Sequence, residues 1–384
     1  MRKFFLLILL LIIGCNPAQT TTSTSFINPG IETISVPSRT VLLLAANGKI
    51  ESGLSQAEVA AKNESINPLT GLPVDDQAIL NRRPILVKVS NYPRTGRPHA
   101  GLSSADIVFE YYIGEMFNRF LAIFYGSDSS QVGPIRSGRL VDSQLAQMFQ
   151  GILVYGNADD RVDEILAQQL KERAVPTKFG VCPPICGTDT HDIAGIFVDT
   201  GYLSASAHDM GIDNTRPDLN GMYFQQAPPD EGLKADTLAV QYAKINRGEW
   251  HYDSESGTYL RWIEELDEND ELYMAPLVDR NTGNQLSFSN IIILSTFYVE
   301  YNRTMHNIDL ENNQIGQRAL LFRDGNLYEG LWRSNGIDHP LQFLDQIGNP
   351  LPLKPGKTWV FLAGISSTFK ETNPANWELL FYLP

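Results

Sequence analysis

The sequence lacks a hydrophobic run long enough to cross a bilayer. Its unbroken apolar stretch, residues 4–13, is about half the length of a transmembrane helix. The stretch follows Arg2 and Lys3 and leads into Gly14 and Cys15. This pattern predicts a bacterial lipoprotein signal peptide over residues 1–14, cleaved before Cys15, whose thiol then carries lipid such as palmitate. We therefore expect an extracytoplasmic protein that is anchored to the membrane by lipid.

Basic residues are scarce. The chain has 30 Lys and Arg against 44 Asp and Glu, and loss of Arg2 and Lys3 with the signal leaves 28 against 44, a net charge of −16. Such a charge repels nucleic acid and anionic lipid surfaces, so neither is an expected partner. Binding to a polyanion such as a cell-wall polymer would require a local basic site.

Cysteine is also scarce, with three residues in 384. Once Cys15 is acylated, Cys182 and Cys186 remain as a pair that can form a disulfide outside the cytoplasm. The loop they would close is short, so the bond would contribute roughly 2 kcal/mol and would act locally.

The usual enzyme motifs are missing. Ser137 lacks the glycine two residues earlier that a nucleophile elbow requires, and Gly356-Lys357-Thr358 lacks the first glycine of a phosphate-binding loop. No His-Glu-x-x-His and no Gly-x-Gly-x-x-Gly occurs. We expect no cofactor.

The length suffices for two domains, and the composition changes along the chain. Residues 15–65, rich in Thr, Ser, Pro and Gly, predict a flexible tether. Residues 66–221 alternate short apolar strands (85–89, 107–109, 120–124, 152–155) with amphipathic helices, which predicts an α/β domain. One helix is expected over residues 137–150, and the next carries Val162, Ile165, Leu166 and Leu170 on one face. Residues 222–384 contain mainly strand patterns and an Asp324-Gly325 turn, which predicts a mostly β (α+β) domain.

Several motifs occur in one order: residues 67–71, Arg83-Pro84 with Asn91, Arg97-Pro98, Gly101-Leu102, residues 105–108 with Glu110, residues 119–124, residues 133–139, residues 330–332 and residues 355–359. Together they resemble those of the YerB-like lipoproteins, a family with two paired domains of unknown function. The resemblance implies lipoprotein character and a two-domain layout, and it brings no known reaction. The chain departs from the family pattern at Tyr155-Gly156-Asn157-Ala158 and at Thr190-His191-Asp192.

The segment Gly133 to Arg139 is the strongest candidate site. Gly133-Pro134 favours a turn, Ser137 could cap the following helix, and Arg136 and Arg139 would lie at its N-terminus. Cations there oppose the helix dipole, a cost that an anion would offset. The loop carrying Asn91 and Arg97 could contribute to the same site. The alternative is that the two arginines pair with acidic residues of the chain itself, namely Asp106, Glu110, Glu115 or Asp142.

Asp106 and Glu110 are four residues apart on a predicted strand, so they share one face and could serve as a general acid and base. Salt bridges with nearby arginines, Arg119 among them, are the more ordinary interpretation. Trp262, Trp332 and Trp359 could stack on sugar rings, but core positions are the more common outcome.

His191, with Asp189, Asp192 and the two nearby cysteines, includes metal-ligand types, but the spacing matches no standard site. We expect a loop histidine that hydrogen-bonds locally and no metal. Our main hypothesis is a binding or accessory protein of the cell envelope that recognises an anionic or glycan ligand. One alternative is a hydrolase acting on an envelope glycan or phosphodiester, and another is a structural partner in a larger envelope complex.

Overall fold

The computed structural model describes residues 65–177, 182–188, 192 and 194–383. The predicted signal peptide, Cys15, the tether up to residue 64 and His191 lie outside the described residues. Within those ranges, no helix is long and apolar enough to span a membrane.

The larger sheet of the described part has 12 strands, with the main order β18-β17-β16-β14-β19-β2-β3-β1-β4-β5. Strands β15 and β8 pair at its side, with β14 and β17 respectively. The strands are β1 (Ile85–Ser90), β2 (Ile107–Gly114), β3 (Phe117–Phe124), β4 (Ile152–Tyr155), β5 (Ala174–Pro176), β8 (Leu233–Lys234), β14 (Asn290–Asn302), β15 (Met305–Asp309), β16 (Gln317–Arg323), β17 (Asn326–Arg333), β18 (Gln342–Leu344) and β19 (Thr358–Gly364).

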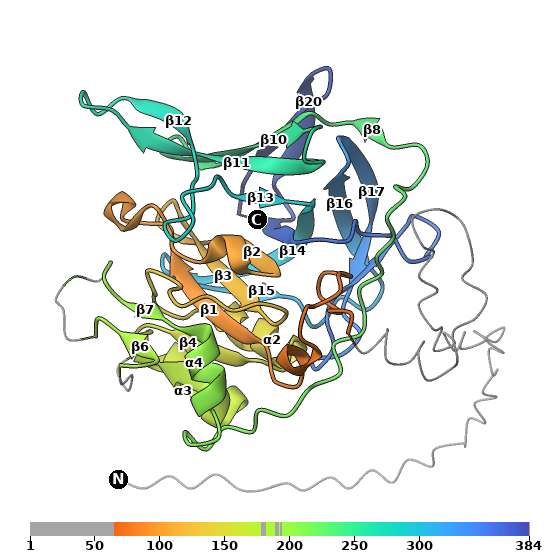
Figure 1. The fold of residues 1–384 in the computed structure, drawn as a ribbon. Coiled ribbons are helices and arrows are strands. Elements are labelled where there is room, and N and C mark those ends of the chain that lie inside the picture. Colours follow the sequence, from red (N-terminus) through yellow and green to blue (C-terminus); the bar gives the residue numbers. More distant parts are fainter. Residues whose placement is uncertain (1–64, 178–181, 189–191, 193, 384) are drawn as a thin grey trace, which may run out of the picture. The chain divides into compact units, whose positions relative to one another are not determined.

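A second sheet of seven strands has the main order β12-β11-β10-β9-β21-β20, with β13 paired to β11. It lies at the top of Figure 1. Its strands are β9 (Thr237–Ala243), β10 (Asn246–Asp253), β11 (Thr258–Leu266), β12 (Leu272–Pro276), β13 (Ser287–Phe288), β20 (Thr368–Asn373) and β21 (Asn376–Leu380). A small hairpin joins β6 (Ile185–Cys186) and β7 (Phe197–Val198).

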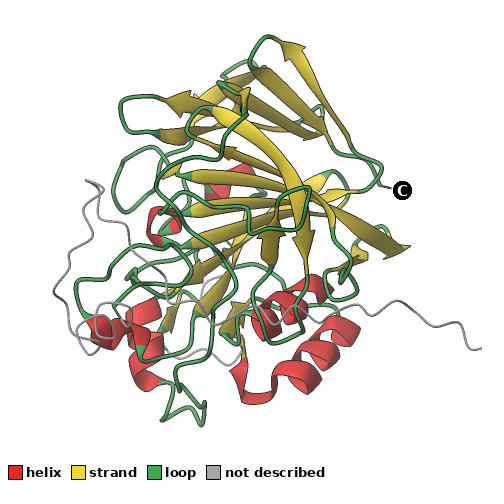
Figure 2. Cartoon of the chain, turned by 90° about the vertical axis from the view of Figure 1, so that its right-hand side faces the viewer, coloured by secondary structure: helices red, strands yellow, loops and turns green. Residues whose placement is uncertain are grey.

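The α-helices are short and gather at the end of the molecule away from the second sheet (Figure 2). The α-helices are α2 (Leu140–Met148), α3 (Asp160–Leu170) and α4 (Thr200–Ser206), and the 3-10 helices are η1 (Gln77–Leu80), η2 (Arg94–Gly96), η3 (Leu102–Ser104) and η4 (Lys171–Arg173). The predicted α/β character of the first half and β-rich character of the second are confirmed.

Each face of the larger sheet packs against a different layer. Leu145 of α2 and Leu166 of α3 join one core with Phe109 of β2. Trp250 and Tyr259 of the second sheet join the opposite core. Because both faces are covered, β1 and β4 are buried along their whole length, which explains their nearly continuous apolar sequences.

The larger sheet takes strands from both sides of the expected boundary at residues 221 and 222. Strand β19 pairs in parallel with β2, from Thr358↔Ile107 to Leu362↔Tyr111, and with β14 on its other side. The two halves of the sequence therefore share one hydrogen-bonded sheet.

Candidate functional site

The predicted arginine turn lies at the carboxyl ends of β1 and β4. These parallel strands pair only from Ile85↔Ile152 to Val87↔Val154, and the turn then runs between them. Arg136 donates its backbone N–H to the Lys88 carbonyl at 2.9 Å and accepts at its own carbonyl from Gly156 at 2.7 Å. Loops at the carboxyl ends of parallel strands, where neighbouring strands diverge, commonly form ligand sites in α/β sheets.

Four cations gather at this point, and we call them the basic cluster: Lys88, Arg119, Arg136 and Arg139. Lys88 comes from β1 and Arg119 from β3, opposite Ser90 in the sheet register. Arg136 comes from the turn, and Arg139 is the N-cap residue of α2. The sequence prediction named two of the four.

The three arginines of the basic cluster form no ion pair with a carboxylate among the described residues. Their side chains instead donate to uncharged oxygens. These hydrogen bonds run from Arg119 to the Ser137 carbonyl at 2.7 Å, from Arg136 to Ser90 Oγ at 3.0 Å and from Arg139 to the Gly138 carbonyl at 2.8 Å.

The acidic partners expected for Arg136 and Arg139 are engaged elsewhere. Asp142 binds Lys88, Glu110 binds Arg261, Glu115 lies 3.7 Å from Arg303, and Asp106 accepts hydrogen bonds from Asn67, Tyr125 and Gly126. The predicted helix cap at Ser137 is wrong. Helix α2 begins at Leu140, and Asp142 accepts a hydrogen bond from the backbone N–H of the N-cap residue, Arg139, at 2.7 Å.

Lys88 lies beneath the arginines in the apolar interior. It is 0% exposed, as is Asp142, and its Nζ lies 3.1 Å from Asp142 Oδ1. Tyr111 of β2 accepts a hydrogen bond from Lys88 and donates one to Asp142. Burial, aided by repulsion from Arg119 and Arg139, lowers the pKa of Lys88 to about 7, although Asp142 opposes the shift.

The arginines also repel one another. Burial, with repulsion from Arg139 and Arg136, lowers the pKa of Arg119 to about 9. Burial likewise lowers the pKa of Arg136, with Asp192 opposing, and that of Arg139, with Asp142 opposing. An anion near these groups would stabilise their charged forms.

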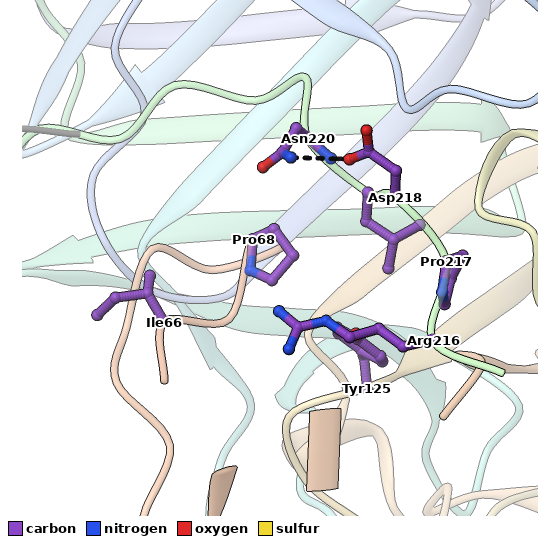
Figure 3. A pocket seen from close by; sticks show the side chains of 8 residues that line it. Ile66, Pro68, Tyr125, Arg216, Pro217, Asp218 and Asn220 are labelled. Atoms are coloured by element: carbon purple, nitrogen blue, oxygen red, sulfur yellow. Dashed lines mark hydrogen bonds between the residues drawn. The ribbon is translucent and has the colours of Figure 1, made fainter. Parts of the chain in front are cut away.

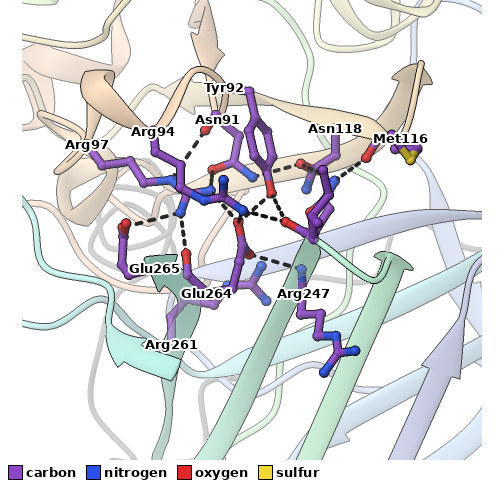
Figure 4. Close-up of polar contacts among 12 residues, drawn as sticks. Asn91, Tyr92, Arg94, Arg97, Met116, Asn118, Arg247, Arg261, Glu264 and Glu265 are labelled. Carbon is purple, nitrogen blue, oxygen red and sulfur yellow. Dashed lines mark hydrogen bonds and ion pairs between the residues drawn. The ribbon is translucent and has the colours of Figure 1, made fainter. Parts of the chain in front are cut away.

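Asn91 and Arg97 do not join the basic cluster. They belong to a separate network under the second sheet, shown in Figure 4. Arg97 pairs with Glu264 at 3.0 Å and with Glu265 at 3.2 Å, and it also donates to Asn91 at 3.0 Å. Tyr92 donates to Glu264 as well. Because each of these charges is paired inside the protein, this network holds η2 and its loop against β11.

Glu110 and Asp106 do not form an acid–base pair. Glu110 is 1% exposed and binds Arg261 at 3.1 Å and Trp359 Nε1 at 2.9 Å. Asp106 is 5% exposed and accepts a hydrogen bond from Asn67 at 2.9 Å. Burial raises the pKa of Asp106 to about 6 and also raises that of Glu110. Trp332 and Trp359 are core residues at 0% exposure, whereas Trp262 is partly exposed.

A cavity of about 290 Å³ is lined by none of the predicted site residues (Figure 3). Pro68, from one of the motifs that carry the family resemblance, lines it. The other lining residues are Ile66, Tyr125, Arg216, Pro217, Asp218, Leu219 and Asn220.

Cys182 and Cys186 form a disulfide in the structure, with their Cα atoms 4.6 Å apart. In the described ranges, no group of three or more His, Cys, Asp or Glu side chains is arranged to hold a metal ion.

Sequence reasoning missed Lys88 and gave Arg119 only the role of a salt-bridge partner. A signal for Lys88 was present, because it is the one charged residue in the apolar run 85–89, and a buried charge requires a specific partner. Arg119 gave a weaker signal, since it lies at the edge of its apolar run. Their convergence with the arginine turn depends on the β3-β1-β4 order, which local patterns do not specify.

Comparison with known proteins gives consistent matches along the chain. A model described as the N-terminal domain of a protein of unknown function (DUF3048) matches residues 69–180, and the corresponding C-terminal domain matches residues 238–360. The protein named Putative lipoprotein YerB, from Bacillus subtilis (strain 168), is 30% identical over 311 residues, covering 76% of this chain and 84% of that protein. The crystal structure of YerB from Bacillus subtilis aligns with a TM-score of 0.65 and 27% identity, covering 78% of this chain and 96% of that one.

Proposed function

The chain belongs to the DUF3048 family, as its motifs predicted, and on this premise we propose that it is a lipid-anchored envelope protein that binds an anionic ligand at the basic cluster. The ligand class is a polymer or glycan of the cell envelope that carries phosphate or carboxylate groups.

The anchor is supported by the signal-like residues 1–14, by Cys15 and by the name of the YerB relative. Substitution Cys15→Ala removes the thiol that would carry lipid. We expect the variant to lose palmitate labelling and to leave the membrane pellet. Equal labelling and equal sedimentation of the variant and the unsubstituted protein would contradict the anchor.

The observation that carries the ligand proposal is the local excess of positive charge. The whole chain has a formal charge of −14, yet among the described residues Lys88–Asp142 is the one ion pair that any of the four cations forms. Arginines elsewhere find acidic partners: Arg82 with Asp128 at 2.8 Å, Arg97 with Glu264 at 3.0 Å, and Arg261 with Glu110 at 3.1 Å. Guanidinium groups without carboxylate partners suit bidentate binding of phosphate or carboxylate.

Binding is favoured over hydrolysis because the two candidate carboxylates are buried and engaged. Asp106 is surrounded by hydrogen-bond donors, and Glu110 is held by Arg261 and Trp359. A general acid or base must reach the substrate within hydrogen-bond distance. Neither group is placed to do so in this conformation.

The test measures binding of the full chain, in detergent, to fractionated anionic envelope polymers. We expect Arg136→Ala/Arg139→Ala to weaken binding about 100-fold or more, because each charge-assisted hydrogen bond contributes about 1.5–3 kcal/mol. The matched control is Arg303→Ala/Arg318→Ala. It removes the same charge from two exposed side chains, which are 85% and 46% exposed.

Binding in the unsubstituted protein should also weaken as salt rises, since exposed charges are screened. Circular dichroism establishes that each variant is folded. Equal binding by the cluster variant and the control variant would overturn the proposal, because net charge alone would then explain the affinity.

A further inference from the structure

We propose that anion binding at the basic cluster is coupled to protonation of Lys88, so that the site takes up one proton together with its ligand. This inference rests on the proposed function and adds a form of regulation to it. The reaction is a simple protonation: the neutral amine of Lys88 gains a proton from solvent and becomes an ammonium ion as the anion binds.

Lys88 is the most deeply buried residue of the basic cluster. Its side chain is 0% exposed on the α2 face of β1, beneath the arginines that come from β3 and the turn. The group has one carboxylate partner, Asp142 of α2, at 3.1 Å, and one neutral partner, Tyr111 of β2. The charges of Arg119 and Arg139 oppose its own.

The partner carboxylate is shared. Asp142 also accepts a hydrogen bond from Tyr111 and a 2.7 Å hydrogen bond from the backbone N–H of Arg139. Asp142 therefore neutralises the positive charge of Lys88 and also caps the N-terminus of α2. Ionised Lys88 adds a fourth positive charge beside Asp142, at a position that is 0% exposed.

Other titratable groups around the cluster are less suited to this role. Burial, with opposition from Glu300, lowers the pKa of His306, on β15, whose charged form Arg139 also disfavours. Burial and Asp163 raise the pKa of Tyr155, on β4, well above its usual value. The pKa of His306 is thus moved below the usual histidine value and that of Tyr155 above the usual tyrosine value, whereas the pKa of Lys88, lowered to about 7, lies between pH 6.5 and pH 8.

An anion beside the arginines would offset their repulsion of Lys88 and raise its pKa. An opposite charge within about 4–6 Å typically shifts a pKa by 1–3 units. The sign follows from linkage: the bound state holds the proton more tightly, so affinity is highest at low pH and falls as pH rises through about 7. From these values, binding should weaken about four- to eightfold between pH 6.5 and pH 8.

Sulfate is the probe, because it remains a dianion throughout this range. Isothermal titration calorimetry of the full chain in detergent, in two buffers of different ionisation enthalpy, gives both the affinity and the number of protons taken up. We expect net proton uptake near pH 7.5 and the four- to eightfold loss of affinity at pH 8. Lys88→Arg, which stays charged, should bind sulfate without proton uptake.

Lys88→Arg could fail to fold, so a second variant is required. Lys88→Met/Asp142→Asn removes both members of the buried pair while leaving an oxygen to accept from the Arg139 N–H. Its sulfate affinity should be the same at pH 6.5 and pH 8. Sulfate binding by the unsubstituted protein that is equal at both pH values, with no proton uptake, would overturn the coupling and leave the proposed function intact. Absence of sulfate binding at pH 6.5 would overturn both.

Discussion

Asp106 shows how one buried carboxylate can hold a family motif in place. Its Oδ1 accepts from the side chain of Asn67, and its Oδ2 accepts from the backbone N–H groups of Tyr125 at 2.6 Å and Gly126 at 3.0 Å. The Asn67 side chain in turn accepts from the N–H of Leu69. The Asn-Pro-Leu-Thr-Gly segment is thereby fixed to the chain that leaves β3, so its role here is structural.

The same residue gives a pH-dependent stability. Burial raises its pKa from 3.8 to about 6, so the folded protein binds this proton more tightly than the unfolded chain does. Stability from this group is therefore fully present below about pH 3.8 and is lost as pH rises through about 6. The loss should reach about 3 kcal/mol by pH 7.

Asp106→Asn does not titrate, so the difference in unfolding free energy between the two proteins isolates this group. In urea denaturation, that difference should shift by about 2 kcal/mol in favour of Asp106 on going from pH 7 to pH 4. A difference that stays constant across this range would show that the native carboxylate titrates like an unfolded one.

At the residue level, sequence reasoning identifies residue types more readily than partners. Arg136 and Arg139 stand out because they follow Gly133-Pro134 in an acidic chain. Glu110 could be recognised as a candidate for an ion pair, but its partner, Arg261, is 151 residues away. No local pattern specifies such a contact, because it arises from the packing of the second sheet on the first.

Among the elements, the start of α2 shows how a local rule can be overridden. Serine is a favoured N-cap residue, and Ser137 stands near the start of the periodic segment. The chain instead stays extended through Arg139, because Arg136 hydrogen-bonds to Lys88 of β1 and to Gly156 after β4, and the Ser137 carbonyl accepts from Arg119. Asp142 then supplies the capping oxygen from within the helix.

This arrangement predicts opposite results for two substitutions near the helix start. Ser137→Ala should change the free energy of unfolding by less than about 0.5 kcal/mol, since the Ser137 hydroxyl makes no hydrogen bond within the described residues. Asp142→Ala should cost about 3–5 kcal/mol, because it removes the cap and leaves Lys88 buried without a carboxylate. Chemical denaturation measures both. A loss of unfolding free energy above about 1 kcal/mol in Ser137→Ala would show instead that Ser137 does cap the helix.

For the whole molecule, the secondary-structure class of each half was predictable from the sequence, but the joining of the two halves in one β-sheet was not. Strands 85–89 and 152–155 have strong apolar patterns, and each forms close to its expected position. The pairing of β19 with β2 joins residues about 250 apart in sequence. Periodicity records which face of a strand is buried and carries no information about its neighbour.

The shared sheet predicts that neither half folds alone. Strand β19 is fully buried between β14 and β2, so a chain ending at residue 221 would expose the whole edge of β2 from Ile107 to Tyr111. Exposed apolar edges of this kind aggregate. We expect residues 65–221 and 222–384 to be insoluble or unfolded when expressed separately, and to form a stoichiometric soluble complex when expressed together. Size-exclusion chromatography and circular dichroism distinguish the cases. A monomeric fragment 65–221 with a cooperative unfolding transition would show instead that β19 is an addition to a sheet already stable without it.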